Sequence, residues 1–281
     1  MIANPSPNEL RTEHSRIRFP EGFQDLAKKV GESFEFARSK VGEHFGYPDS
    51  TTEIFLHATP EQMYAGLRVH SPFSPAVARV LAFRVGISPA SRATLHILCK
   101  SGNKEPWLWH MVTDEYCDGR LDDLYGPALV ADARWFYEGI GAYEAHRALR
   151  TSFPQSETRW SRASFKVTAK ALLRGKLLSF TELLSEGNWM RNIEQSDYVW
   201  YLQYAQAYAF VAYLVNHHGI DELKQVLSLL TSGLPLGNAM EEALGKRYGR
   251  LLFGFKAFLI RYALSLTWPR VRHAVRRRSS R

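Results

Sequence analysis

The stretch WLWHMVTDEY, from Trp107 to Tyr116, decides how this 281-residue chain is interpreted. It predicts a helix in which His110 and Asp114 lie four residues apart. Residues i and i+4 share one face of a helix, about one 5.4 Å turn apart, so the imidazole and the carboxylate can reach a common point. That geometry is typical of a pair of metal ligands.

The spacing matches part of the motif HExxH, in which two histidines bind zinc and the intervening glutamate activates the metal-bound water as a general base. His110 stands at the first ligand position, and Asp114 offers an oxygen ligand at the second. Met111 occupies the general-base position. A thioether accepts no proton at a useful pH and is a poor ligand for a hard metal site, so the ordinary hydrolytic base is missing.

A second unusual acid lies in WFYEGIGAYEA, from Trp135 to Ala145. Glu138 sits between aromatic residues and a glycine, on a predicted helix that is otherwise largely apolar. A buried carboxylate is costly unless it is paired with a charge, hydrogen-bonded or bound to a metal. Glu138 is therefore a candidate partner of His110 and Asp114.

The patterns along the chain predict an α+β fold. Residues 1–20 are rich in Pro, Asn, Ser and charge and are expected to be a flexible lead. Residues 21–104 are expected to contain a small mixed sheet, mostly antiparallel, and residues 105–267 to be helical. Residues 268–281 form a basic tail. The expected strands are Thr52–Ala58, RVLAFRVG and ATLHILC, the last two separated by ISPASR.

Helices are expected at Glu21–Phe45, from Pro60 onward, at Trp107–Cys117 and at Ala131–Leu149. Further helices are expected near Phe180–Ser185, Tyr198–Asn216, Asp221–Leu230, Leu236–Leu244 and Leu251–Leu266.

From Glu21 to Leu266 the chain resembles the peptidase MA-like domain of the gluzincin metallopeptidases. HMVTD aligns with the HExxH helix of that family, and WFYEGIGAY with its glutamate helix. YAQAYAFVAYLVNHHG and DELKQVLSLLTSGLPLGNAMEEALGKRYG match its C-terminal helices. The resemblance implies a zincin-like fold, in which the sheet covers the helix that carries His110 and the helical half forms the opposite wall of the cleft.

The same resemblance implies that His110, Asp114 and Glu138 are the metal ligands. One imidazole and two carboxylates can hold zinc, manganese or iron. Because Met111 replaces the base, we expect a degenerate member that binds a peptide or protein in the former active-site cleft. Tyr204 and Tyr208 are candidates to line it. The alternative is an active metal-dependent peptidase or hydrolase in which Glu115, four residues after Met111, supplies the base.

A third interpretation needs no metal. His110 and Asp114 would form a salt-linked pair, and Glu138 would be hydrogen-bonded to a tyrosine or to backbone groups. His57 and His96 fall in predicted strands and are expected to be structural. His217 and His218 are expected at a helix end, and Cys99 and Cys117 are expected to be two reduced thiols.

Charge and composition limit the partners. The net charge is +8, but six arginines lie in the last twelve residues, and without them the excess falls to two. We expect this tail to be solvated, although it could contact an acidic partner. No nucleic-acid motif accompanies it, so nucleic acid is not the expected partner. We see no signal peptide or membrane span, which favours a cytoplasmic location.

Overall fold

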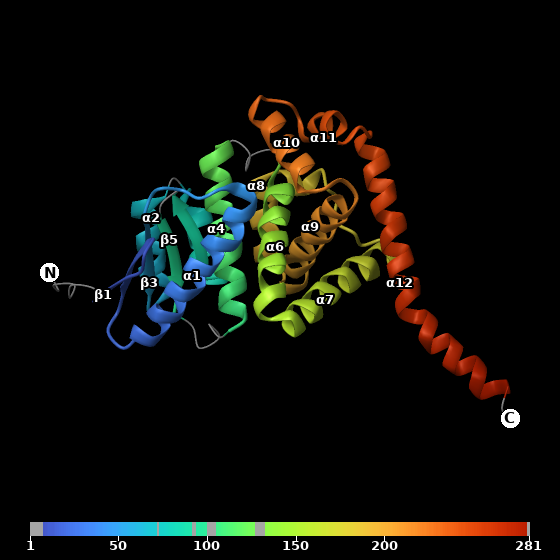
Figure 1. Ribbon diagram of the computed structural model, residues 1–281, viewed down its shortest axis with the longest axis horizontal. Helices are drawn as coiled ribbons and strands as arrows, with labels where there is room; N and C mark the ends of the chain where they lie inside the picture. Colours follow the sequence, from blue (N-terminus) through green and yellow to red (C-terminus); the bar gives the residue numbers. More distant parts are fainter. Residues whose placement is uncertain (1–7, 72, 92–93, 100–104, 127–132, 280–281) are drawn as a thin grey trace.

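The computed structural model describes residues 8–71, 73–91, 94–99, 105–126 and 133–279, with the backbone alone for 89–91 and 266–279. A five-stranded sheet in the N-terminal half and a helical C-terminal half confirm the α+β class (Figure 1).

The sheet consists of β1 (Asn8–Arg11), β2 (Ser15–Phe19), β3 (Thr52–His57), β4 (Ile87–Ser91) and β5 (Thr94–Leu98), in the order β1-β2-β3-β5-β4. The β2–β3 and β3–β5 pairs are parallel, whereas β1–β2 and β4–β5 are antiparallel. The sheet is therefore mixed as expected, but it is not mostly antiparallel.

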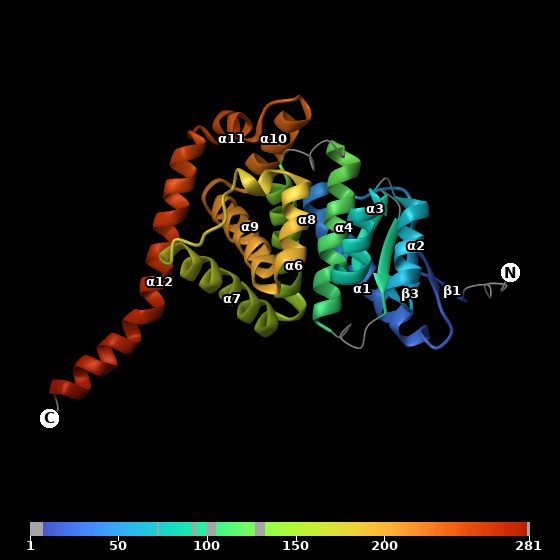
Figure 2. The same ribbon diagram turned by 180° about the vertical axis from the view of Figure 1, so that it is seen from behind.

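Helices cover both faces of this sheet. Figures 1 and 2 show α1 (Gln24–Phe45) and α4 (Trp107–Tyr125) on one face and α2 (Pro60–His70) on the other. In β3 the buried residues alternate, with Ile54 and Leu56 on one face, whereas β5 is buried on both faces from Leu95 to Leu98. Helix α4 thus lies between the sheet and the helical half.

The helical half is built around α6 (Arg134–Ser152), which packs against α4 and α9 (Asp197–His218). Nearly every residue of α6 from Trp135 to Leu149 is buried, as expected for a helix enclosed on all sides. The other members are α7 (Pro154–Leu173), η2 (Glu182–Leu184), α8 (Glu186–Gln195), α10 (Ile220–Thr231), α11 (Leu236–Leu244) and α12 (Tyr248–Ser279). Among the described residues, no helix has both the length and the apolar character needed to cross a bilayer.

Three sequence predictions about the N-terminal half are wrong. Residues 8–19, expected to be part of a flexible lead, form β1 and β2. RVLAFRVG, expected to be a strand, is helical: it spans the end of α3 (Pro75–Val80) and the π-helix η1 (Leu81–Val85). Ser74 caps this segment by accepting a hydrogen bond from the Val77 N–H, and Pro75 follows at the first helical position. The strand β4 lies instead within ISPASR, the expected separator.

Helices α7 and α8 were not foreseen, and α12 runs through most of the expected tail. The buried face of α7 includes Ser164, Thr168, Ala169 and Ala171. The sequence of α7 therefore lacks the large apolar residues at helical spacing that would have predicted it.

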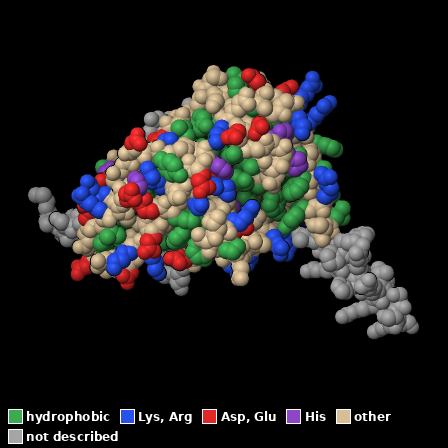
Figure 3. Space-filling view, in the orientation of Figure 1, with side chains coloured by type: hydrophobic (Ala, Val, Ile, Leu, Met, Phe, Trp, Pro, Cys, Tyr) green, Lys and Arg blue, Asp and Glu red, His purple; other side chains and the backbone are tan. Residues whose placement is uncertain are grey.

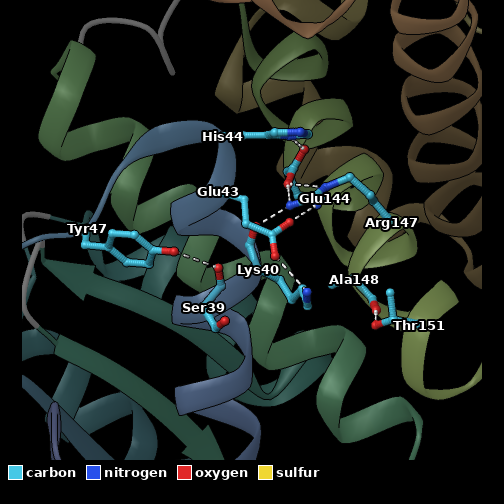
Figure 4. A network of polar contacts seen from close by, with 9 residues as sticks. All are labelled: Ser39, Lys40, Glu43, His44, Tyr47, Glu144, Arg147, Ala148 and Thr151. Atoms are coloured by element: carbon cyan, nitrogen blue, oxygen red, sulfur yellow. Dashed lines mark hydrogen bonds and ion pairs between the residues drawn. The ribbon is translucent and has the colours of Figure 1, made fainter.

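A polar network ties α1 to α6 (Figure 4). The fully buried Glu144 lies 2.7 Å from Nδ1 of His44 and accepts a 2.8 Å hydrogen bond from Nη2 of Arg147. Arg147 also donates to Glu43 at 2.7 Å and to the Lys40 carbonyl. Because both oxygens of the buried carboxylate are bound, its burial is compensated and the two helices keep a fixed register.

A histidine stack fills the space between the sheet and α2. Nε2 of His57 lies 2.8 Å from Nδ1 of His96, the two rings are parallel within 6°, and His70 packs against His96 with ring centroids 5.5 Å apart. A Cβ at Gly66 would lie 2.8 Å from the His57 ring, so α2 needs glycine there to approach. Burial lowers the pKa of His57 to about 4 and that of His96 to about 3. Both histidines are therefore structural and neutral at pH 7.

This stack should make the fold acid-sensitive. In the unfolded chain both imidazoles take up a proton near their ordinary pKa of about 6.5, whereas the folded chain resists protonation until about pH 4. The free energy of unfolding should therefore fall as the pH drops from 6.5 to 4, with these two groups adding up to about 2.7 kcal/mol per pH unit to the slope. Urea unfolding at successive pH values measures this slope of the free energy of unfolding with pH. His57→Asn/His96→Asn should have a shallower slope, and an unchanged slope would contradict the assignment.

Candidate functional site

A cavity of about 580 Å³ opens where α4, α6, α7 and α9 meet the end of η1. Its size falls within the range of about 300–1,000 Å³ that is usual for ligand sites. The aromatic residues in its wall are Trp107, Trp160, Trp200, Tyr201, Tyr204 and Tyr208; the polar and charged ones are Arg84, His110, Asp114, Glu115, His146, Ser164 and Asp197; and Met111 lines it as well. The structure thus brings most of the predicted site residues to one cavity.

His110 is held in the cavity wall by aromatic rings. Trp107 stacks on it with centroids 5.3 Å apart, and Trp160 and His146 meet it edge-on at 5.7 and 5.0 Å. The side chain is only 8% exposed, and its Nδ1 has no hydrogen-bond partner within the described residues. Burial lowers the pKa of His110 well below its usual range, so the ring is neutral at pH 7 and one of its nitrogens can accept a hydrogen bond.

The carboxyls of Asp114 and Asp118 point from α4 toward α6. A Cβ at Gly141 would lie 2.6 Å from Oδ1 of each, so only glycine leaves room for both side chains. Both Oδ1 atoms are buried without a hydrogen-bond partner among the described residues. Burial, followed by the neighbouring carboxyl of Glu138, raises the pKa of both groups well above the usual range for aspartate.

Glu115 also lines the cavity, beside Met111. Burial and the carboxyl of Glu138 raise the pKa of Glu115 to about 8. A carboxyl with such a pKa exchanges protons near neutral pH, which is the property that a general base or acid needs.

Glu138 lies behind this wall and is paired with Arg134, one turn earlier on α6. Arg134 also lies 3.9 Å from Glu186 of α8, and Tyr204 forms a further hydrogen bond with Glu138. Burial raises the pKa of Glu138, although the guanidinium of Arg134 opposes that rise. Of the arrangements predicted for Glu138, the hydrogen bond to a tyrosine is therefore present, and the ion pair with Arg134, which was not predicted, accompanies it.

The residues fit a metal only in part. His110 and Asp114 each carry a buried atom without a partner, as two ligands of a bound ion would. The Glu138 carboxylate, however, is engaged by Arg134, whose positive charge opposes a cation at that point. Among the described residues, no three His, Cys, Asp or Glu side chains are arranged to hold a metal ion. As the side chains stand, they do not fit zinc, and the three-ligand site stays a prediction.

The two predicted cleft tyrosines both reach the cavity. Tyr204 lines the cavity and is hydrogen-bonded to Glu138 behind the wall. The Tyr208 hydroxyl lies 2.8 Å from the Ser161 hydroxyl of α7. Tyr208 stacks on His146 with centroids 4.1 Å apart, and Nδ1 of His146 lies 3.8 Å from Glu157. His146 was not predicted from the sequence as a site residue, although it lies eight residues after Glu138 and therefore on a similar helical face.

The remaining candidates are structural. Nδ1 of His217 lies 2.8 Å from the Tyr213 carbonyl near the end of α9, as expected for a residue at a helix end. Cys99 and Cys117 are free thiols, and burial raises the pKa of the Cys117 thiol well above its usual range. That thiol is therefore protonated at pH 7 and unsuited to act as a nucleophile.

No protein-family model matches the chain, and a search of the curated proteins finds no match. The likeness to the gluzincin domain therefore rests on the sequence motifs, and the function must be argued from the cavity itself.

The close approach of α6 to α9 should depend on Gly139. A Cβ there would lie 2.6 Å from the Val211 side chain and 2.8 Å from the Ala207 carbonyl oxygen, and the latter belongs to backbone that cannot rotate away. Gly139→Ala should lower the free energy of unfolding by about 1–3 kcal/mol in denaturant titrations. Gly119→Ala is the matched control, because a Cβ at Gly119 of α4 meets nothing within 4 Å. The control should be neutral or stabilise by up to about 1 kcal/mol. Equal effects of the two variants would show that α6 and α9 are not in tight contact at Gly139.

Proposed function

We propose that this chain is a degenerate metallopeptidase-like protein that binds a peptide segment of another molecule in its cavity without cleaving it. The observation that carries this proposal is the wall of the cavity itself. It places Met111 beside His110 and Asp114, and the carboxylate next to that wall, Glu138, is held by Arg134.

Two features oppose hydrolysis. Met111 cannot activate a water molecule, because a thioether takes up no proton at a useful pH. The charge of Glu138 is already balanced by Arg134, so recruiting Glu138 for another partner would break a buried ion pair and leave the guanidinium only its longer contact with Glu186, at 3.9 Å. Breaking a buried ion pair in this way costs on the order of 3–5 kcal/mol.

The cavity suits a peptide segment. Its wall combines large aromatic faces with a few polar groups, which is the usual composition of a binding site. Trp107 is 46% exposed and Tyr201 is 45% exposed, so rings at its border are open to an incoming chain. Aromatic side chains supply contact area at a low entropic cost, as they do in many recognition surfaces.

One observation favours an alternative, an active hydrolase with an altered site. Glu115 lies in the same wall as Met111, and its raised pKa of about 8 suits proton transfer near neutral pH. In that alternative Glu115 replaces the missing base, and Glu115→Gln would abolish activity. The binding function is better supported, because the alternative also requires Glu138 to leave Arg134.

The first test is catalytic. The purified protein, assayed with casein and a mixed peptide library, should show no cleavage that a chelator suppresses. The reason is that Met111 stands at the position of the general base and its thioether cannot activate water. Chelator-sensitive cleavage that is lost in Glu115→Gln would overturn the binding proposal and establish the alternative.

The second test restores the motif. Met111→Glu/Asp114→His should raise the affinity for zinc at least about tenfold over the wild type, because it supplies a second imidazole beside His110. Competition with a zinc-sensitive dye measures the zinc affinity of each protein. The control Met111→Leu/Asp114→Asn alters the same positions without adding a ligand and should not gain affinity. Equal zinc affinity in all three proteins would show that His110 and position 114 do not converge.

A further inference from the structure

Helix α12 buries one apolar face against the body of the protein. Leu251, Phe255 and Leu259 follow one another at intervals of four residues and are at most 1% exposed, and the Phe255 ring stacks on Phe210 of α9 with centroids 4.7 Å apart. Residues four apart share one face of a helix, so these side chains hold α12 in place. Figures 1 and 2 show α12 along the outer edge of the helical half, with its last turns extending beyond the other elements.

The opposite face of α12 carries large apolar side chains as well, and these are open to solvent. Phe253 is 74% exposed, Ile260 is 43% exposed and Leu264 is 60% exposed. Their spacing of seven and four residues places them within about 40° of one another around the helix. We call these three residues the outer stripe. Single exposed apolar side chains are ordinary, but a row of them along one face indicates an interaction surface.

The same helix holds the excess positive charge of the chain. Residues 248–281 contain nine of the 36 Lys and Arg and none of the 28 Asp and Glu, so the rest of the chain has one more acid than base. Arg250, Lys256 and Arg261 are exposed and form no ion pair with any described residue. At about 100° per residue, Lys256 lies on one side of the outer stripe and the two arginines on the other. In Figure 3, hydrophobic side chains (green) adjoin Lys and Arg (blue) along the right-hand edge of the described part, where α12 runs in Figure 1.

The surface of an anionic bilayer fits both features of this face. Apolar side chains of such a helix enter the boundary between headgroups and acyl chains, while the stems of Lys and Arg lie along them and carry their charges to the phosphates. A second copy of the chain would bring two rows of cations together, which opposes pairing of α12 with itself. A nucleic acid would engage the cations but would leave the outer stripe without a contact.

We propose that α12 lies on the surface of a bilayer that contains anionic lipids, with the outer stripe in the interface and the flanking cations at the phosphates. The helix lies in the plane of the surface and does not cross it. Its backbone stays helical to Ser279, and residues 266–279 add five arginines to the same helix. The inference goes beyond the proposed function and does not depend on what the cavity binds.

Sedimentation with vesicles tests the inference. The full chain is titrated with vesicles of phosphatidylcholine alone, or with vesicles in which about 30% of the lipid is phosphatidylserine. Binding to the anionic vesicles should be at least about tenfold tighter, because only their surface attracts the cations of α12. The difference should shrink as the salt concentration rises, since salt screens exposed charges.

The first pair of variants tests the outer stripe. Phe253→Gln/Ile260→Gln should weaken binding to the anionic vesicles at least about tenfold, because the buried apolar area is lost. Val69→Gln/Leu124→Gln is the matched control: it changes apolar residues of α2 and α4 that are 77% and 43% exposed, and it should leave binding unchanged.

The second pair tests the cations. Lys256→Gln/Arg261→Gln should weaken the same binding at least about fivefold. Lys28→Gln/Lys29→Gln removes the same charge from exposed positions on α1 and should have no effect. Thermal unfolding of all four variants verifies that they are folded.

Several results would overturn the inference. One is equal binding to neutral and anionic vesicles, or binding to neither; another is binding that survives unchanged in either variant of α12. A dimer in sedimentation velocity that Phe253→Gln/Ile260→Gln abolishes would show that a second copy covers the outer stripe instead. An oligonucleotide bound more tightly than the anionic vesicles would identify nucleic acid as the partner. Each of these results leaves the proposed function of the cavity standing.

Discussion

The ion pair between Arg134 and Glu138 is the interaction on which the interior of the helical half depends. Glu138 is 4% exposed, and burial together with the Glu138 carboxyl raises the pKa of the neighbouring Asp114, Glu115 and Asp118. One guanidinium cannot neutralise all of them, which is why burial and mutual repulsion raise the pKa of the whole group. The pair fixes α6 internally and, through Glu186, links it to α8. It also determines which carboxylates remain available to a ligand.

Close helix packing brings these carboxyls together. Gly139 lets α6 approach the backbone of α9, and Gly141 makes room for Asp114 and Asp118 of α4. The same α6 is tied to α1 through the buried Glu144 and Arg147. A helix held on three sides cannot shift away from the carboxyls, so they stay close together. The helix that packs the core, α4, thus also forms part of the cavity wall, through Trp107, His110 and Met111.

The sequence predicted those helices and strands in which large apolar residues recur at the spacing of the element's buried face. The helices around Phe34 and Tyr208 and the strands that carry Ile54 and Ile97 were expected close to their observed bounds, whereas the helix around His110 was expected to end at Cys117 and runs to Tyr125. The predictions were wrong where small or polar residues fill the buried face of a helix, as in α7. They were also wrong where Ser74 caps a helix and Pro75 begins it, because the apolar residues that follow had been expected to form a strand. In the site, the unusual burial of Glu138 was foreseen, but its partner was not. Arg134 lies four residues earlier, a spacing that allows an ion pair along a helix. His146 and Trp160 were missed because their place in the cavity depends on how α6, α7 and α4 pack, which no local pattern shows.

The most direct test of the account is to locate zinc by anomalous diffraction in crystals of the wild-type protein grown with zinc. We predict that Arg134 stays paired with Glu138 and that no ion lies within the ligand distance of about 2.0–2.2 Å of that carboxylate. An ion bound jointly by His110, Asp114 and Glu138, with Arg134 displaced, would contradict the account and identify the cavity as a metal centre.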